Sequence, residues 1–175
     1  MAATLTGLTG NVSSTVDLKG IQTEVDGTVE QAPVLHSLSI PYTFGTGAAQ
    51  ANELFAALVT ITTGASEELD LYALAAVLGR TASLAKVKGI QIINLGTAAD
   101  HLLQVGGAVA EAWEPWVKTA GDAIVIRPGA SFQVACGAAD TTGYAVVENT
   151  TDKLKLTNPG ATTLTCKVTL WGVSG

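Results

Sequence analysis

The sequence predicts an all-β protein built from two packed antiparallel sheets. Residues 152–172 alternate apolar and polar side chains on both sides of one Asn-Pro-Gly turn, which is typical of a β-hairpin with one dry and one wet face. Further short alternating segments are separated by Gly and Pro turns. No amphipathic helix of ordinary length is available to cover a parallel sheet, so the apolar faces of the strands must bury one another.

The first 32 residues are poor in large apolar side chains and rich in Thr, Gly, Ser, Gln and acidic residues. Such a segment cannot bury enough surface to fold alone. We therefore expect residues 1–32 to form a flexible N-terminal arm or extended segment and residues 33–175 to form the β-sandwich domain. The arm is either a frayed terminus or a segment that becomes ordered on a neighbouring subunit, and its stretch TVDLKGIQTEV could supply a strand in either case.

A long half-buried strand is expected from Val34 onwards. Apolar and polar residues alternate there, which predicts one buried face made of Val34, His36, Leu38, Ile40, Tyr42 and Phe44. Pro41 indicates an edge strand or a bulge. We interpret His36, which falls on the apolar face, as a packed core residue rather than a metal ligand or a catalytic base.

The segment SEELDLYALAAVLGR, residues 66–80, fits two interpretations. Leu69, Leu71 and Ala73 have strand spacing, whereas the apolar residues from Leu71 to Leu78 have helical spacing, with acidic residues in front. We expect a strand to about Leu71, followed by a helical turn. This is at most one short helix in the fold.

The rest of the chain reads as short strands joined by turns. Strands are expected in LFAALVTITTG, VKGIQIINL, HLLQV, AIVIRPG, SFQVAC, YAVVEN and the closing hairpin, giving about eight to ten in all. Cys136 and Cys166 each share a strand face with apolar residues. We interpret both as buried, reduced thiols that behave as small hydrophobic side chains.

Composition argues against several classes of function. Charged residues make up 14% of the 175 residues, against about 25% in typical soluble domains, which suits a surface that lies against other subunits. The net charge is −6 and the basic residues are scattered, so nucleic-acid binding is disfavoured. No apolar run is long enough to cross a membrane, and the N-terminal residues lack the pattern of a signal peptide.

No group of residues predicts catalysis, a metal or a cofactor. The base in a nucleophilic site would have to be His36 or His101, and His101 follows Asp100 in a way that places the two side chains on opposite faces of a strand. The densest acidic group is Glu67, Glu68 and Asp70, which we interpret as a solvated segment rather than a cation site. The glycines match no phosphate-binding loop. We therefore expect a protein that is not an enzyme.

Trp113 and Trp116 form the best candidate contact surface. They flank Glu114 and Pro115 in a segment that reads as a loop. Indole rings bury large areas and are enriched at interfaces and on sugar-binding platforms. The alternative is that both rings cover the end of the sandwich. Trp171, at the end of the dry-faced strand, reads as a core residue.

The second half of the chain contains five strand and turn signatures, at residues 90–94, 105–108, 127–129, 152–160 and 171–174. The first of them is IQIIN, the second VGGA, the third RPG, and the fourth ends in the Asn-Pro-Gly turn. Through these elements the chain resembles the capsid cement or decoration proteins of tailed bacteriophages. The resemblance covers about residues 86–175, and residues 1–32 have no counterpart in it.

The resemblance implies a jelly-roll-like sandwich that forms homo-oligomers, often trimers, on the outside of an icosahedral head. Such a protein is made in the host cytoplasm, becomes part of the virion and bridges major capsid subunits without catalysis. Many weak contacts over symmetric copies add up to strong attachment through avidity. The alternative function is a carbohydrate-binding or host-recognition head-fibre or tail module that uses the loop of Trp113 and Trp116.

Overall fold

The computed structural model describes residues 5–23, 29–75, 81–117 and 121–175, and the side chains of all of these except 16–23, 29–34 and 36. Its elements are strands, which are β1 (Gly10–Thr23), β2 (Val29–Phe44), β3 (Gln50–Ala51), β4 (Glu53–Ile61), β5 (Ser66–Asp70), β6 (Leu74–Ala75), β7 (Thr81–Ala82), β8 (Leu84–Asn94), β9 (Leu103–Gly106), β10 (Ala123–Ile126), β11 (Ser131–Ala135), β12 (Tyr144–Ala145), β13 (Lys153–Thr157) and β14 (Leu164–Ser174).

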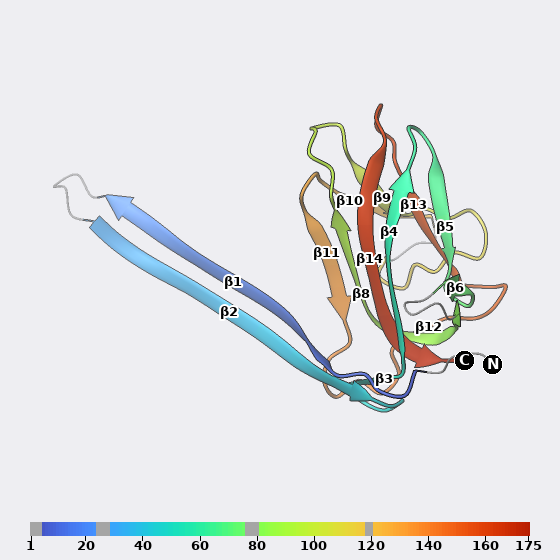
Figure 1. Cartoon of the computed structure of the whole chain (residues 1–175). Coiled ribbons are helices and arrows are strands. Elements are labelled where there is room, and N and C mark those ends of the chain that lie inside the picture. The colour runs from blue at the N-terminus through green and yellow to red at the C-terminus, as the bar shows by residue number, and fades with distance from the viewer. Residues whose placement is uncertain (1–4, 24–28, 76–80, 118–120) are drawn as a thin grey trace.

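Nine of these strands form two facing antiparallel sheets (Figure 1). One sheet has the order β11-β8-β14-β4, with β12 added beside β8, and the other has the order β10-β9-β13-β5. The chain passes from one sheet to the other at β4–β5, β5–β8, β8–β9, β10–β11, β12–β13 and β13–β14. This is the strand order of a jelly roll. The predicted all-β, jelly-roll-like sandwich is therefore confirmed.

The core lies between the two sheets and is supplied by alternate residues of each strand. In the closing hairpin every predicted inward side chain is fully buried, namely Leu154, Leu156, Leu164, Cys166, Val168 and Leu170. Cys136 and Cys166 are both buried and free, as predicted. Burial in apolar surroundings raises the pKa of both thiols to about 11.

The described residues contain no helix, and hence none that is long and apolar enough to cross a membrane. Ser66–Asp70 forms β5, as the strand interpretation required, because it pairs with β13 along its whole length. The helical turn expected after Leu71 is wrong where the chain is described. Leu71 is followed by a turn and then by β6, which pairs with β7. The remainder of the expected turn, residues 76–80, lies outside the described residues.

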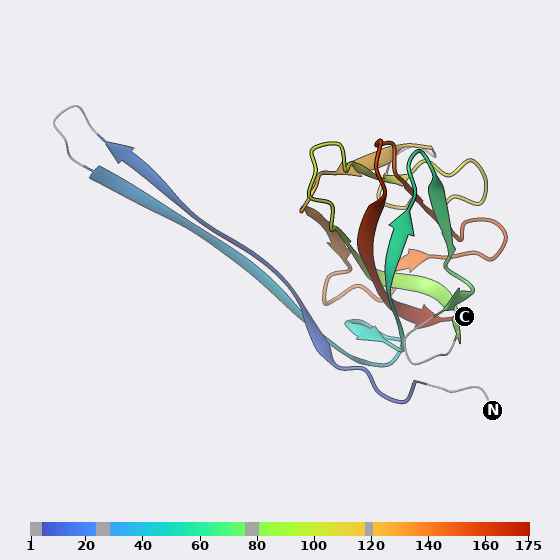
Figure 2. The same ribbon diagram turned by 45° about the horizontal axis from the view of Figure 1, so that its top comes forward.

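The long strand β2 is not half-buried along its length, and here the sequence prediction is wrong. β2 pairs with β1 from Thr23↔Val29 to Gly10↔Tyr42, and the two strands run away from the sandwich as a hairpin (Figures 1 and 2). Leu38 is 60% exposed and Phe44 42% exposed, while Ile40 and Tyr42 are buried. The prediction of a buried side chain holds for Ile40 and Tyr42 and fails for Leu38 and Phe44, because the strand leaves the sandwich together with β1. The side chains of Val34 and His36 lie outside the described residues.

We call the hairpin of β1 and β2 the arm. It runs from Gly10 to Phe44, so it includes the expected arm segment from residue 10 and also residues 33–44, which we had expected in the sandwich domain. The sequence contains the signal of this hairpin, since Asp26-Gly27 stands between two segments of strand-like composition.

Candidate interaction surface

The arm is fixed to the sandwich at its root by a small second core. This core is made of Ile40, Tyr42, Ala51 and Trp171, against which Leu8, Val12, Ala49, Leu54 and Ala135 pack. The rings of Tyr42 and Trp171 meet edge to face, with centroids 5.9 Å apart and an interplanar angle of 78°. The Tyr42 hydroxyl lies 3.1 Å from the Cys136 carbonyl oxygen and 3.3 Å from that of Lys88. The arm is thus tied to β8 and to the end of β11.

Trp171 can take this position because its neighbour on β8 is a glycine. Trp171 pairs with Gly89 across the sheet, and Gly89 pairs in turn with Ala135. A Cβ atom on Gly89 would overlap the indole of Trp171. The ring therefore lies over the bare backbone of β8, on the outer side of the sheet. Trp171 is buried, as expected, but by the root of the arm and not by the sandwich core.

The arm has two unlike faces, because residues directly opposite each other in an antiparallel pair share a face. Val12 pairs with Ile40, Ser14 with Leu38 and Gly10 with Tyr42. We call this side the apolar face of the arm. In the same register it includes positions 16, 18, 32 and 34, which are Val, Leu, Ala and Val, and also positions 20, 22, 30 and 36, which are Gly, Gln, Glu and His. The other face carries Asn11, Ser13, Thr15, Ser37 and Ser39, together with Leu35, which is 67% exposed.

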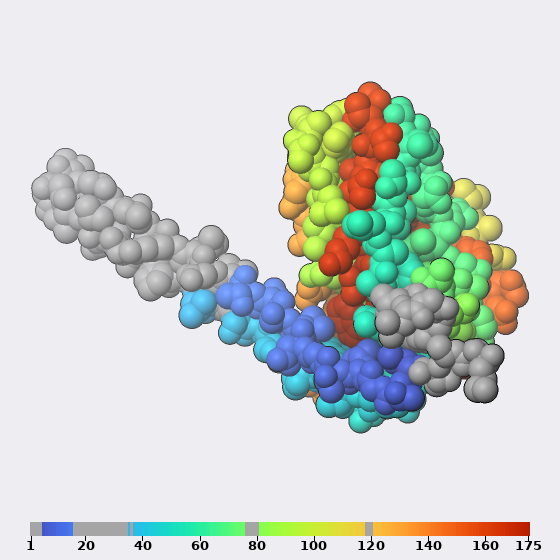
Figure 3. All heavy atoms as spheres, in the orientation of Figure 1, coloured from blue at the N-terminus to red at the C-terminus, as the bar shows by residue number. Residues whose placement is uncertain are grey.

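The outer face of the five-stranded sheet is a second surface with little charge. We define it by the outward residues of the four long strands, Leu54, Ala56, Leu58, Thr60, Gln91, Ile93, Ser131, Gln133, Thr165, Lys167 and Thr169. Lys167 is the single charged residue in this set. Figure 3 shows β4, β14 and β8 uncovered on this face above the root of the arm. Leu58 is 68% exposed there.

The polar side chains on this outer face bond to one another across the strands. The Gln91 amide donates to the Gln133 side-chain oxygen at 3.0 Å, and the hydroxyls of Thr60 and Thr165 lie 3.2 Å apart. Neutral polar groups that already have partners are less costly to cover than free charges. The face therefore combines exposed apolar area with a low cost of desolvation.

A groove of about 330 Å³ lies where the arm root meets this sheet. Its walls come from residues 8–13 and Tyr42 on one side and from outward sheet residues, including Leu54, Gln133 and Trp171, on the other. The groove marks the point at which the two surfaces diverge.

Trp113 and Trp116 lie together against the main core. Trp113 is 1% exposed and its indole N–H donates to the Ala145 carbonyl oxygen at 2.9 Å. Its ring meets Trp116 edge to face, with centroids 4.6 Å apart, and Trp116 in turn packs against Phe132. Trp116 is partly buried. The ring of Trp113 is thus a core group, and Trp116 is the indole of this pair that still reaches the surface.

Glu114, between the two indoles, holds the surrounding loops together. It is 9% exposed, and its two carboxylate oxygens accept hydrogen bonds from the backbone N–H groups of Ala108, at 2.9 Å, and Gly121, at 2.8 Å. Each oxygen therefore has a backbone donor. The carboxylate has a structural role and is not presented to a ligand.

His101 joins two loops and does not activate a nucleophile. Its Nδ1 accepts a hydrogen bond from the Thr97 backbone N–H at 3.1 Å, and its Nε2 lies 2.6 Å from the Thr162 hydroxyl. Since Nδ1 is an acceptor, the neutral ring carries its proton on Nε2 and donates it to Thr162. A ring in this tautomer cannot take the proton of that hydroxyl. Asp100 lies beside the same hydroxyl, at 3.5 Å.

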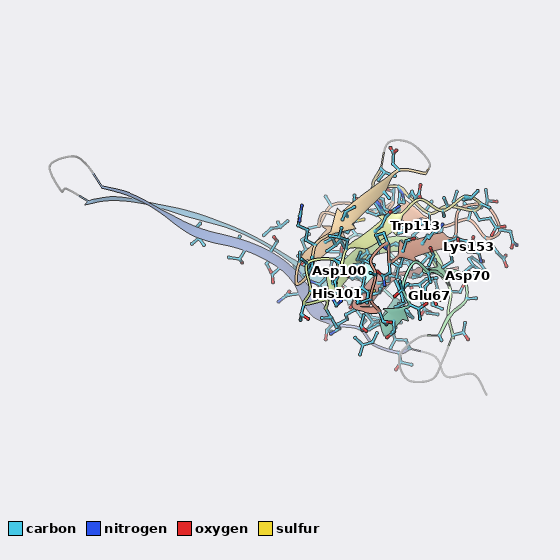
Figure 4. All side chains as sticks on the ribbon, turned by 90° about the horizontal axis from the view of Figure 1, so that it is seen from above. Glu67, Asp70, Asp100, His101, Trp113 and Lys153 are labelled. Carbon is cyan, nitrogen blue, oxygen red and sulfur yellow. The ribbon has the colours of Figure 1, made fainter. Side chains whose placement is uncertain are left out.

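The three acidic residues of β5 do not form one cluster. Asp70 forms an ion pair of 2.6 Å with Lys153 on β13, whereas Glu67 and Glu68 are exposed. Partial burial works to raise the pKa of Asp70, but hydrogen bonds from Lys153 and the Tyr72 amide outweigh it, so this pKa lies below its usual value. Figure 4 shows Asp70 and Lys153 well apart from Asp100 and His101. Within the described residues, no group of three or more His, Cys, Asp or Glu side chains could hold a metal ion.

No protein-family model and no curated protein matches this chain. Among solved structures, it is similar to a de novo designed double-stranded β-helix determined by solution NMR. The match covers 66% of this chain and 96% of the designed chain, with 11% identity and a TM-score of 0.34. A likeness this slight carries no argument, so the fold assignment rests on the strand order and the functional proposals rest on the surfaces described above.

Proposed function

We propose that this chain is a structural virion protein, a cement or decoration protein that binds the outside of a tailed-phage head and stabilises it by bridging major capsid subunits. The sequence resemblance over residues 86–175 motivates the virion setting. The jelly-roll sandwich, the projecting arm and the weakly charged outer sheet face suit a protein that works by contact.

The observation that carries the proposal is the arm with its uncovered apolar face. Leu38 is 60% exposed on that face although it continues the line of the buried Ile40 and Tyr42. Burying one such side chain stabilises an assembly by about 1.5–3 kcal/mol, and the gain is repeated in every copy on a symmetric head. An arm of this kind gives a small sandwich the reach to join two neighbouring subunits.

The alternative function, carbohydrate or host recognition, depends on an exposed aromatic ring face. With Trp113 buried, that function would fall to Trp116 and its partly buried indole. The surface available for stacking is therefore smaller than the sequence suggested, and we favour the capsid-binding function.

The test is binding to heads of the encoding phage that lack this protein. The full chain should sediment with such heads at saturable stoichiometry and should raise their resistance to heat. A shortened chain, in which residues 16–36 are replaced by Asn-Gly between Thr15 and Ser37, keeps the arm root and should bind at least tenfold more weakly. Thr15 and Ser37 are partners in the hairpin register, so the replacement closes a two-residue turn.

A matched control is Val109→Ser, at a loop residue that is 95% exposed and distant in sequence from the arm. This variant should bind heads as the full chain does. Both variants should keep the melting temperature of the sandwich, which shows that any loss of binding does not come from unfolding. Failure of the full chain to sediment with heads would contradict the proposed function.

A further inference from the structure

The two uncovered surfaces are extensions of one interface that the chain already makes with itself. At the root, the apolar face of the arm packs against the outer side of the five-stranded sheet, where Ile40 and Tyr42 meet Trp171 and Leu54. Beyond the root the two surfaces separate. The apolar face of the arm continues through Leu38, and the outer sheet face continues to Leu58, with neither covered in the described structure.

We propose that the apolar face of the arm of one copy docks on the outer face of the five-stranded sheet of a second copy. The proposal deepens the proposed function and rests on it for its setting, because it names the contact that would link copies on a head. The occupant is a second copy because the root already shows that these two kinds of surface fit each other.

The charges of the two surfaces are compatible with this docking. The outer sheet face carries Lys167 as its single charge. On the apolar face of the arm, the register positions 32–40 of β2 and their partners on β1 carry His36 but no carboxylate, lysine or arginine, whereas Asp17 and Lys19 fall on the opposite face. Glu30 falls on the apolar face nearer the tip, so a contact confined to positions 32–40 leaves this carboxylate outside the interface.

The dimensions allow a weak contact. At 3.3 Å per residue the arm extends about 36 Å from Ile40 to the start of β2 at Val29, and the part of β14 that the arm root leaves free, residues 164–170, extends about 23 Å. A two-stranded ribbon is about 10 Å wide, so one docked arm covers about 230 Å² of sheet. A pair of copies that exchange both arms buries about 900 Å² in total, which is the size of a weak, transient interface.

The experiment compares two disruptive variants with two matched controls, using the purified chain without heads. Leu38→Asp places a charge on the apolar face of the arm, and Leu35→Asp places it on the other face of the same strand, at a similarly exposed position. Leu58→Asp charges the outer sheet face, and Val125→Asp charges an exposed residue of the other sheet. Sedimentation velocity and light scattering measure the association.

The wild-type chain should form an oligomer. Leu38→Asp and Leu58→Asp should each raise its dissociation constant at least tenfold, while Leu35→Asp and Val125→Asp should leave it unchanged. Mixing the Leu38→Asp and Leu58→Asp chains should restore part of the association, since the intact arm of the second can dock on the intact sheet of the first. This restoration requires docking between copies.

A wild-type chain that stays monomeric at about 100 μM would overturn the inference, because even a weak association is populated at that concentration. Equal weakening by Leu35→Asp and Leu38→Asp would overturn it too. Should an Asp variant fail to fold, Leu38→Ser and Leu58→Ser make the same comparison with a smaller change. Head binding by a monomeric chain would leave the proposed function standing, and self-association without head binding would leave this inference standing.

Discussion

Gly89→Ala tests how the arm is held to the sandwich. The added methyl group would overlap the indole of Trp171, which is packed against Tyr42 and Leu54. Overpacking of this kind costs about 1–3 kcal/mol. Displacement of the ring also weakens its edge-to-face contact with Tyr42, a pair worth about 0.5–1.5 kcal/mol.

The expected loss in the free energy of unfolding is therefore about 2–4 kcal/mol. For a chain of this length it lowers the melting temperature by at least about 4 °C, measured by circular dichroism, with urea unfolding as a second measurement. The arm should also become more sensitive to limited proteolysis than in the wild type, because its anchor is loosened. Gly137→Ala is the control, since an added Cβ there meets no atom within 4 Å, and it should change stability by less than about 0.5 kcal/mol.

A double-mutant cycle provides the decisive result. Trp171→Ala removes the ring and should itself cost about 3–5 kcal/mol. In the Trp171→Ala variant no indole overlaps the methyl group added at Gly89, so the loss in free energy of unfolding caused by Gly89→Ala should fall below about 1 kcal/mol. If Gly89→Ala costs the same with and without the ring, or no more than Gly137→Ala, the proposed packing of Trp171 over the backbone is refuted.

Three further predictions concern the sandwich itself. Asn158→Ala should destabilise the chain by about 2–4 kcal/mol in urea unfolding, because it removes a buried amide that donates to the carbonyls of Ile61, Thr62 and Thr162 and accepts one backbone N–H. Asn158→Asp, which keeps only the acceptor, should restore little. Asp70→Asn should cost less than about 1 kcal/mol at neutral pH, since the ion pair with Lys153 is partly exposed. Because the pKa of Asp70 is lowered on folding, this difference should vanish as the pH falls through that pKa, and a difference that grows in acid would contradict the assignment. With a pKa of about 11, Cys136 and Cys166 are thiolate in about one molecule in a thousand at pH 8, so both should resist iodoacetamide in the folded chain and react fully in urea.

The fold could be predicted from the sequence because strand alternation is a local property. The period of two in the closing hairpin assigned each of its inward residues correctly, and the Gly and Pro turns separated the strands. The helical turn predicted after Leu71 is wrong because a short apolar run fits helical and strand spacing equally well. Pairing with β13 stabilises the strand conformation up to Asp70. Residue propensities alone cannot decide between helix and strand in such a segment.

The candidate surface was only partly accessible from the sequence. Trp113 and Trp116 stood out as large rings in a loop, yet the ring of Trp113 is enclosed by Trp116, Tyr144 and the main core. The exposure of a side chain depends on which residues pack over it. The sequence around a tryptophan does not show whether its indole lies in a core or in an interface. The outer sheet face cannot be predicted from the sequence, because its residues come from four strands that are distant in sequence.

The sequence by itself determined the all-β class, the two faces of each strand, the buried thiols and the low surface charge, because each depends on composition or on neighbours within a few residues. Only the tertiary structure decided that β2 leaves the sandwich with β1 as an arm, and that Tyr42 and Trp171 anchor it over Gly89. Alternation states that one face of a strand is apolar. Which surface covers that face is decided by contacts between residues far apart in the chain, and the described residues leave Leu38 60% exposed.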